Sequence, residues 1–182
     1  MHRILKDTGS IYLQMDRNIV HFMRIIADGI LLFDNEIIWA FENPSGYKSI
    51  ANKFVRGHDN ILVYVKTKNR KHNKQYLPYP KDYKPKGKYQ LGISISTVWK
   101  DINSMQCQSI NKVEGTGYST QKPKALLRRI IKASSNEGDL VADFYCGSGT
   151  TLVVAKELNR NYIGCDINSR AIEITKKRLD EI

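Results

Sequence analysis

Residues 140–151 read LVADFYCGSGTT, an apolar run followed by an acid, a glycine-rich turn and two threonines. The apolar run predicts a buried strand over 140–142, and the pattern after the turn predicts a helix over about 150–158. Gly147 and Gly149 are separated by one residue, so the backbone there can turn tightly and a ligand can approach it closely. The stretch therefore predicts a strand, a glycine loop and a helix in succession.

The chain after this helix predicts a second strand and a last helix. The strand covers 162–165 and ends at Asp166, and Asn168 or Ser169 caps a helix that runs to about Leu179. An acid at the end of a second strand stands where nucleotide-binding sheets hold ribose hydroxyls. The order indicates half of a doubly wound α/β sheet with a site for a nucleoside-containing ligand, although an ordinary strand-to-helix turn would use the same glycines.

Two classes of cofactor are disfavoured by the residues around the turn. A dinucleotide fingerprint has a third glycine where this chain has Leu152. A phosphate-binding P-loop needs a Gly-Lys-Ser/Thr sequence, which this chain lacks. We therefore expect an adenosine-type cofactor without a pyrophosphate.

The rest of the chain also predicts α/β elements. Pro123 begins an amphipathic helix, a position that suits proline. Further upstream the pattern predicts strands over 10–13, 36–41 and 61–65, a helix over 18–27 and a possible strand over 93–98. The 182 residues are enough for one domain with a small excursion and a core of its own.

The chain is strongly basic, with 29 Lys and Arg against 18 Asp and Glu and a formal net charge of +11. This surplus indicates a polyanionic partner, nucleic acid before a membrane surface, although a generally Lys-rich composition would give the same balance. Residues 66–90 hold nine Lys and Arg, one acid, four tyrosines and three prolines. They predict an extended excursion that is suited to phosphates and bases, or else a solvated loop anchored by its tyrosines.

Other classes of protein are disfavoured by what the sequence lacks. No apolar run is long enough to cross a bilayer, and the first residues do not have the order of a signal peptide, which predicts a cytoplasmic protein without a membrane partner. The three cysteines form no Cys-x-x-Cys pair, and no histidine stands at ligand spacing from them. Neither a metal site nor a disulfide framework is therefore expected.

Several motifs together resemble the amino-methyltransferases that act on DNA at adenine N-6 or cytosine N-4. The most specific are Tyr145–Thr151, similar to the S-adenosylmethionine loop, Thr120–Pro123 upstream of it, and Gly164–Asp166 with the ribose-binding acid. Weaker resemblances are carried by Gly9–Tyr12, Asn35–Trp39, His58-Asp59 with Tyr64, and Trp99–Ile102. The resemblance covers nearly the whole chain, and the motif order is similar to the permuted β group of these enzymes.

The resemblance implies a Rossmann-like S-adenosylmethionine-dependent methyltransferase fold. Residues 1–65 would form part of the sheet, 66–117 a basic excursion like a target-recognition segment, and 118–182 the cofactor-binding part. The implied residues for the cofactor, S-adenosyl-L-methionine, are Thr120, Lys122, Asp143, Tyr145, Cys146, Gly147, Gly149, Thr150, Asp166 and Ile167. The implied residues for double-stranded DNA are Lys66, Lys68, Arg70, Lys71, Lys74, Tyr76, Tyr79, Lys84, Lys86 and Lys88.

Among the implied cofactor contacts, each part of the cofactor has its own residues. The backbone of 145–149 would cradle the methionine end, and Asp143 would face its amino group. Thr120 and Lys122 would reach its carboxylate, for which a fixed cation is well suited. Asp166 would bind the ribose hydroxyls, and the residue after it, Ile167, would pack on the adenine.

One departure from the family is large. Its catalytic signature is an Asp-, Asn- or Ser-Pro-Pro-Tyr/Trp tetrapeptide, and no Pro-Pro occurs in these 182 residues. In the permuted group the tetrapeptide lies upstream of the part that matches Gly9–Tyr12. We therefore expect a fold that is incomplete on its N-terminal side, with no catalytic residue of its own, and truncated and inactive or dependent on a partner. The expected partner is a second polypeptide with the missing motifs or a second copy of the chain. A smaller departure is Phe144, where the family usually has proline.

The implied function is site-specific DNA methylation of restriction–modification type. The adenine amino group is the first expectation and the cytosine amino group the second, because the residue that bears on this choice belongs to the missing tetrapeptide. A non-catalytic DNA-binding remnant is the alternative from another class, since the charge and the basic excursion would suffice for it. A nicotinamide oxidoreductase half-domain is disfavoured by Leu152 and by the Thr-Gln-Lys-Pro sequence.

Overall fold

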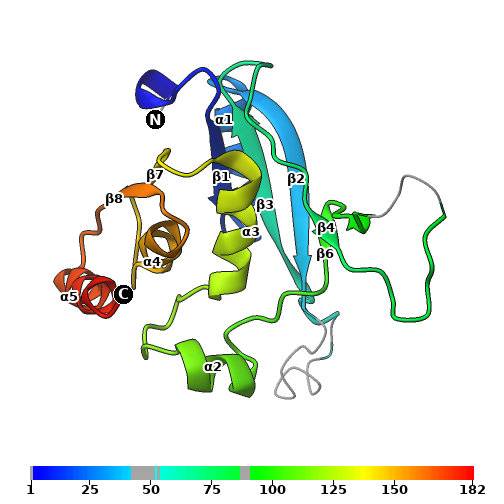
Figure 1. Cartoon of the computed structure of the whole chain (residues 1–182). Helices are drawn as coiled ribbons and strands as arrows, with labels where there is room; N and C mark the ends of the chain where they lie inside the picture. The colour runs from blue at the N-terminus through cyan, green and yellow to red at the C-terminus, as the bar shows by residue number, and fades with distance from the viewer. Residues whose placement is uncertain (1, 42–51, 53, 87–90) are drawn as a thin grey trace. The chain divides into compact units, whose positions relative to one another are not determined.

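The computed structural model describes residues 2–41, 52, 54–86 and 91–182, and it divides into two compact units (Figure 1). Unit 1 consists of Met1–Ala40 and His58–Trp99, and unit 2 of Phe41–Gly57 and Lys100–Ile182. Each unit has a sheet and a hydrophobic cluster of its own. Within the described ranges, no helix is long and apolar enough to cross a membrane.

Unit 1 begins with a short 3-10 turn, η1 (His2–Ile4), and contains a four-stranded sheet of order β1-β3-β2-β6. β1 (Ser10–Gln14) and β2 (Leu32–Ala40) both pair antiparallel with β3 (His58–Val65). The short β6 (Val98–Trp99) adds to β2 in parallel. The last five residues of β3 are all buried, which is typical of a strand covered on both faces.

Helix α1 (Val20–Asp28) packs on this sheet through a cluster of apolar side chains. Val20 and Ala27 of the helix lie against Leu62 and Tyr64 of β3. The Tyr64 hydroxyl donates to Asp28 Oδ1 at 2.6 Å. Burial, followed by this hydrogen bond, raises the pKa of Tyr64 to about 12. The phenol is therefore satisfied inside the cluster, as a buried hydroxyl must be.

Two sequence predictions in unit 1 need correction. The strand expected over 36–41 begins at Leu32, because its first residues pair with the end of β3. The single strand expected over 93–98 is two strands: β5 (Ile93–Ser94) pairs with β4 (Tyr76–Leu77), and β6 follows separately. Residues 95–97 separate them, and the Trp99 indole N–H of β6 donates back to Ser96 O at 2.8 Å. The strands over 10–13 and 61–65 and the helix over 18–27 are confirmed within three residues at their ends.

Unit 2 is built mainly on a βαβ arrangement. Strands β7 (Leu140–Asp143) and β8 (Asn161–Gly164) are parallel, and α4 (Thr150–Glu157) connects them. Helix α3 (Lys124–Ser134) packs on α4 through Ile131, Val154 and Ala155, and α5 (Ser169–Asp180) ends the chain. The predicted order of strand, glycine loop, helix, strand, acid and helix is confirmed, and the Asn168 side chain caps α5 by accepting from Arg170 N.

Three details of unit 2 differ from the sequence predictions. Helix α2 (Gln108–Glu114) was not predicted, since two apolar residues in seven are too few for a clear helical pattern, and in the structure Val113 is 85% exposed. Pro123 is the residue before α3 rather than its first residue. The strand over 140–142 was expected to be buried, but Leu140 is 59% exposed, because among the described residues β7 pairs with β8 alone.

Candidate functional site

The glycine loop, residues 144–149, joins the end of β7 to the start of α4. Gly147 and Gly149 have positive φ angles of 52° and 74°, which residues other than glycine rarely adopt. A Cβ at Gly149 would lie 2.5 Å from the side chain of Thr175, and one at Gly147 would lie 3.2 Å from the ring of Tyr118. Both glycines are therefore required by conformation and by a close neighbour.

Asp166 joins this loop to the end of β8. Its Oδ2 accepts the Gly147 N–H at 2.8 Å, and its Oδ1 accepts the Asn168 N–H at 2.9 Å. These N–H groups, Asn168 first and Gly147 second, lower the pKa of Asp166. The carboxylate is thus held in its charged form and in one orientation. A carboxylate has about four acceptor positions, so about two remain for a ligand's hydroxyl groups.

A second acid, Asp143, stands at the end of β7. Its Oδ1 accepts the Tyr145 N–H at 3.1 Å, and its Oδ2 accepts the Thr151 hydroxyl at 2.6 Å. The ladder between the strands extends past β8, since Cys165 N donates to Asp143 O at 3.1 Å. Both acids therefore lie at the carboxyl ends of neighbouring parallel strands, where open α/β sheets bind their ligands.

The Thr-Gln-Lys-Pro sequence lies beside the glycine loop within unit 2. Buried Gln121 accepts from Thr116 N at 2.9 Å and donates to Glu114 O at 2.6 Å, which fixes the segment between α2 and α3. Tyr118 in this segment is the residue that faces Gly147. Lys122 is half-buried, and burial, with a contribution from Arg56, lowers its pKa.

Sequence reasoning missed Tyr118 and Gln121, and in each case the reason is plain. Gln121 belongs to the Thr-Gln-Lys-Pro motif, but its partners at 114 and 116 lie in a segment without a predictable pattern. Tyr118 is separated from Gly147 by 29 residues, so only the fold reveals their contact. Nothing in the sequence around Gly147 or around Tyr118 indicates that the two residues are in contact.

The predicted cofactor residues fall into two groups by orientation. Tyr145 is 84% exposed and Ile167 is fully exposed, so each offers an apolar surface beside one of the two acids. Thr120 is exposed at the end of the segment that Tyr118 anchors. Cys146 and Thr150 turn into the unit instead and are buried. Burial, together with the nearby acids at 143 and 166, raises the pKa of the Cys146 thiol, so it is a poor nucleophile.

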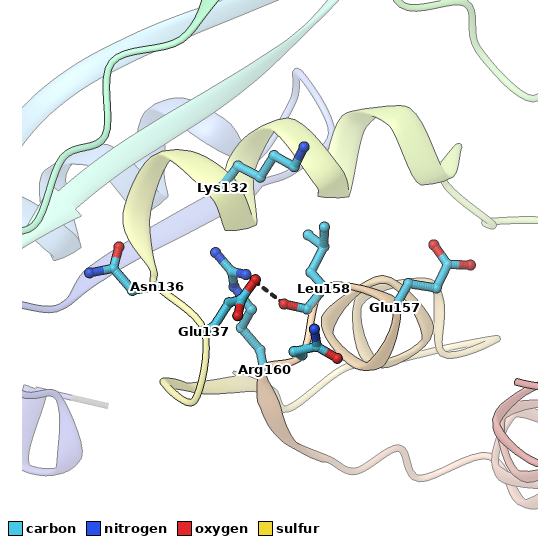
Figure 2. A pocket seen from close by; sticks show the side chains of 7 residues that line it. Lys132, Asn136, Glu137, Glu157, Leu158 and Arg160 are labelled. Carbon is cyan, nitrogen blue, oxygen red and sulfur yellow. Dashed lines mark hydrogen bonds between the residues drawn. The ribbon is translucent and has the colours of Figure 1, made fainter.

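A hollow in unit 2 lies at the opposite end of α4 from the glycine loop. It has a volume of about 520 Å³ and is lined by the ends of α3 and α4 and by the turn before β8 (Figure 2). Arg160 donates there to Leu158 O at 2.5 Å (Figure 2). It also donates to Ser135 O at 2.9 Å, and so closes the turn. Glu157 accepts from Lys124 and Arg128; burial works to raise its pKa, but these cations hold it below its usual value. These side chains bind one another, so we interpret the hollow as the surroundings of a structural ion-pair cluster.

The predicted DNA-binding residues lie in unit 1, except Lys88, which lies outside the described residues. Lys66 pairs with Asp7 at 3.1 Å, and Arg70 pairs with Asp34 at 2.7 Å. Tyr76 belongs to β4, and the ring of Tyr79 lies 4.8 Å from that of Tyr83. The described lysines whose side chains are exposed in this segment are Lys68, Lys74, Lys81, Lys84 and Lys86. Lys71 is half-buried, and its backbone N–H donates to Thr8 O.

Comparison with known proteins gives this arrangement a family. A family model described as DNA methylase matches residues 1–177. The chain belongs to this family. It is similar to the type II methyltransferase M.HpaI of Haemophilus parainfluenzae, with 36% identity over 98% of the chain. It is also similar to the DNA adenine methyltransferase YhdJ of Escherichia coli (strain K12), with 31% identity over 98% of the chain.

A solved structure has the same fold as this DNA methylase chain. The M1.HpyAVI complex with S-adenosylmethionine matches it with a TM-score of 0.69 and 25% identity, over 96% of this chain and 76% of that one. The sequence prediction of an α/β methyltransferase fold is therefore confirmed. The chain spans 56% of the length of M.HpaI and 63% of that of YhdJ.

Proposed function

We propose that this DNA methylase chain binds S-adenosylmethionine at the glycine loop and contributes the cofactor-binding part of a DNA amino-methyltransferase. The observation that carries the proposal is the hydrogen bond from Gly147 N to Asp166, 19 residues apart, which joins the loop to the acid at the end of β8. The residues fit the cofactor by their chemistry. Asp166 keeps acceptor positions for ribose hydroxyls, and exposed Ile167 and Tyr145 offer apolar surfaces to a planar ring.

The remaining groups suit the methionine end of the cofactor. The Asp143 carboxylate would stabilise the ammonium group of the cofactor, and the Lys122 ammonium would stabilise its carboxylate. Burial of Lys122 favours pairing with an anion, because a half-buried ammonium without one is costly. Thr120, next to it, adds an exposed hydroxyl. The cofactor supplies the methyl group when it is bound.

Transfer of that methyl group needs a further part of the enzyme. The exocyclic amino nitrogen of a base is a poor nucleophile, since its lone pair is delocalised into the ring, and it must be held in line with the methyl by hydrogen-bond acceptors. The base must also leave the duplex and stack on an aromatic ring. The family's Pro-Pro tetrapeptide does not occur in these 182 residues. We therefore place this acceptor on residues outside these 182, such as those of a second polypeptide.

Adenine is the target base that we propose first, within a restriction–modification setting in the cytoplasm. M.HpaI is a type II methyltransferase, and YhdJ is a DNA adenine methyltransferase by name. The cytosine amino group is the alternative target within the same reaction class.

Calorimetric titration of the purified chain with S-adenosylmethionine tests the proposal, with NAD as a comparison ligand. We expect saturable binding of the first ligand and none of the second. Incubation with methyl-labelled cofactor and DNA should give no transfer by the chain alone, and transfer at the rate of a complete enzyme would contradict an acceptor outside it. Salt-sensitive DNA binding without any cofactor binding would instead favour a non-catalytic DNA-binding remnant.

The exposed lysines of the basic excursion are proposed to contact DNA phosphates. A Lys84→Gln/Lys86→Gln variant should lower the slope of log affinity against log salt by about 1.8, because each phosphate contact contributes about 0.9. Fluorescence anisotropy with a labelled duplex at several salt concentrations measures this slope. The matched control, Lys176→Gln/Lys177→Gln on the exposed face of α5, removes the same charge and should leave the slope nearly unchanged. Equal slopes for the two variants would contradict a specific role for the excursion.

A further inference from the structure

Helix α5 contacts the glycine loop through two of its side chains, which lie one helical turn apart. The Thr175 hydroxyl donates to Gly147 O at 3.0 Å. Arg178 Nη1 donates to Ser148 O at 2.6 Å and to the Thr150 hydroxyl at 3.1 Å. Residues three apart on a helix share a face, so both side chains reach the loop together.

These contacts are partly buried and leave little freedom to Thr175. Thr175 is 5% exposed, and its side chain lies where a Cβ of Gly149 would be. Burial lowers the pKa of Arg178, although the acids Glu114, Glu157 and Glu181 act against this shift. A half-buried guanidinium gains by donating to fixed oxygens, and here those oxygens belong to the loop.

We propose that Thr175 and Arg178 are positioning residues for the cofactor loop. They direct the carbonyl groups of Gly147 and Ser148 toward α5. Because a trans peptide is planar, the N–H that follows each carbonyl points the opposite way. For the Gly147–Ser148 peptide, the N–H of Ser148 is thus turned away from α5. Neither side chain needs to touch the cofactor for its loss to weaken binding, and this inference rests on the proposed function of the loop.

The test compares two substitutions at Thr175 in the full chain. Thr175→Val keeps the shape and removes the hydroxyl, and it should weaken S-adenosylmethionine binding about tenfold, which corresponds to one lost hydrogen bond. Thr175→Ser keeps the hydroxyl and should stay within about twofold of the parent, even though it removes a buried methyl group. Arg178→Met should weaken binding at least as much as Thr175→Val, and Lys177→Met, on the exposed side of α5, should have no effect.

Thermal unfolding and amide hydrogen exchange separate the possible outcomes. If Thr175→Ser and Thr175→Val lose cofactor affinity to the same extent, and these losses follow their losses of thermal stability, the positioning role is wrong. If the parent chain binds no cofactor, the proposed function fails, but exchange at 147–150 still reports on the inference. Faster exchange there in Thr175→Val than in Thr175→Ser supports the role, and equal exchange overturns it.

Discussion

Replacing Gly149 with alanine is expected to lower the free energy of unfolding of unit 2 by about 2–4 kcal/mol. Two costs add: a non-glycine residue at a φ of 74° costs about 1 kcal/mol, and a methyl group forced into a filled space costs about 1–3 kcal/mol. The methyl group would lie 2.5 Å from Thr175 atoms that are themselves buried, so the neighbour cannot simply move aside. Urea unfolding followed by circular dichroism measures the loss.

Gly138→Ala is the matched control for this prediction. Gly138 has a φ of 78°, but a Cβ there would meet nothing within 4 Å. It should therefore cost only the conformational part, about 1 kcal/mol. If both alanine variants lose the same free energy, the close approach of α5 to the loop is not what requires glycine at 149.

Asp166→Ala is expected to weaken S-adenosylmethionine binding about 100-fold or more, the equivalent of about 3 kcal/mol. The substitution removes the acceptor for the Gly147 N–H, so the loop loses its link to β8, and it removes the acceptors proposed for the ribose hydroxyls. Calorimetric titration of variant and parent under the same buffer conditions gives the ratio of affinities.

A control and a pH titration sharpen this second prediction. Asp180→Ala, an exposed acid at the end of α5, removes the same charge and should leave binding within about twofold of the parent. Because the Asn168 and Gly147 N–H groups hold the pKa of Asp166 below its usual value, its contribution to binding should be fully present above the usual aspartate range and be lost only as the pH falls through the lowered pKa. An Asp166→Ala chain that binds the cofactor like its parent would remove the observation on which the proposed function depends.

The parts of the fold that could be predicted from the sequence are those with local signals. The βαβ arrangement of unit 2 follows from an apolar run, two glycines and an acid that ends the next strand, all within 27 residues. Its buried contacts are not local: Tyr118 reaches Gly147, and α5 reaches the loop across about 28 residues. No periodicity in the sequence records such contacts.

Ion pairs between residues far apart in the sequence also limit what the positive charge of residues 66–90 could predict about exposed cations. Lys66 and Arg70 were predicted to contact DNA, but their partners Asp7 and Asp34 lie far upstream. A window of residues 66–90 shows the cations without the acids that face them. The lysines with exposed side chains can be distinguished from the paired ones only in the structure, and whether they contact DNA remains a prediction.

The β1–β3 pair of unit 1 and the β7–β8 pair of unit 2 differ in how much chain must be closed to form them, and this affects the order in which the two pairs form. Leu140 pairs with Asn161, only 21 residues on, whereas Ser10 pairs with Val65, 55 residues on. Each doubling of a closed loop costs about 0.6 kcal/mol in chain entropy, and non-local pairings slow folding. The β7–β8 pair therefore has the shorter search, and β1 must wait longer for β3 than β7 waits for β8.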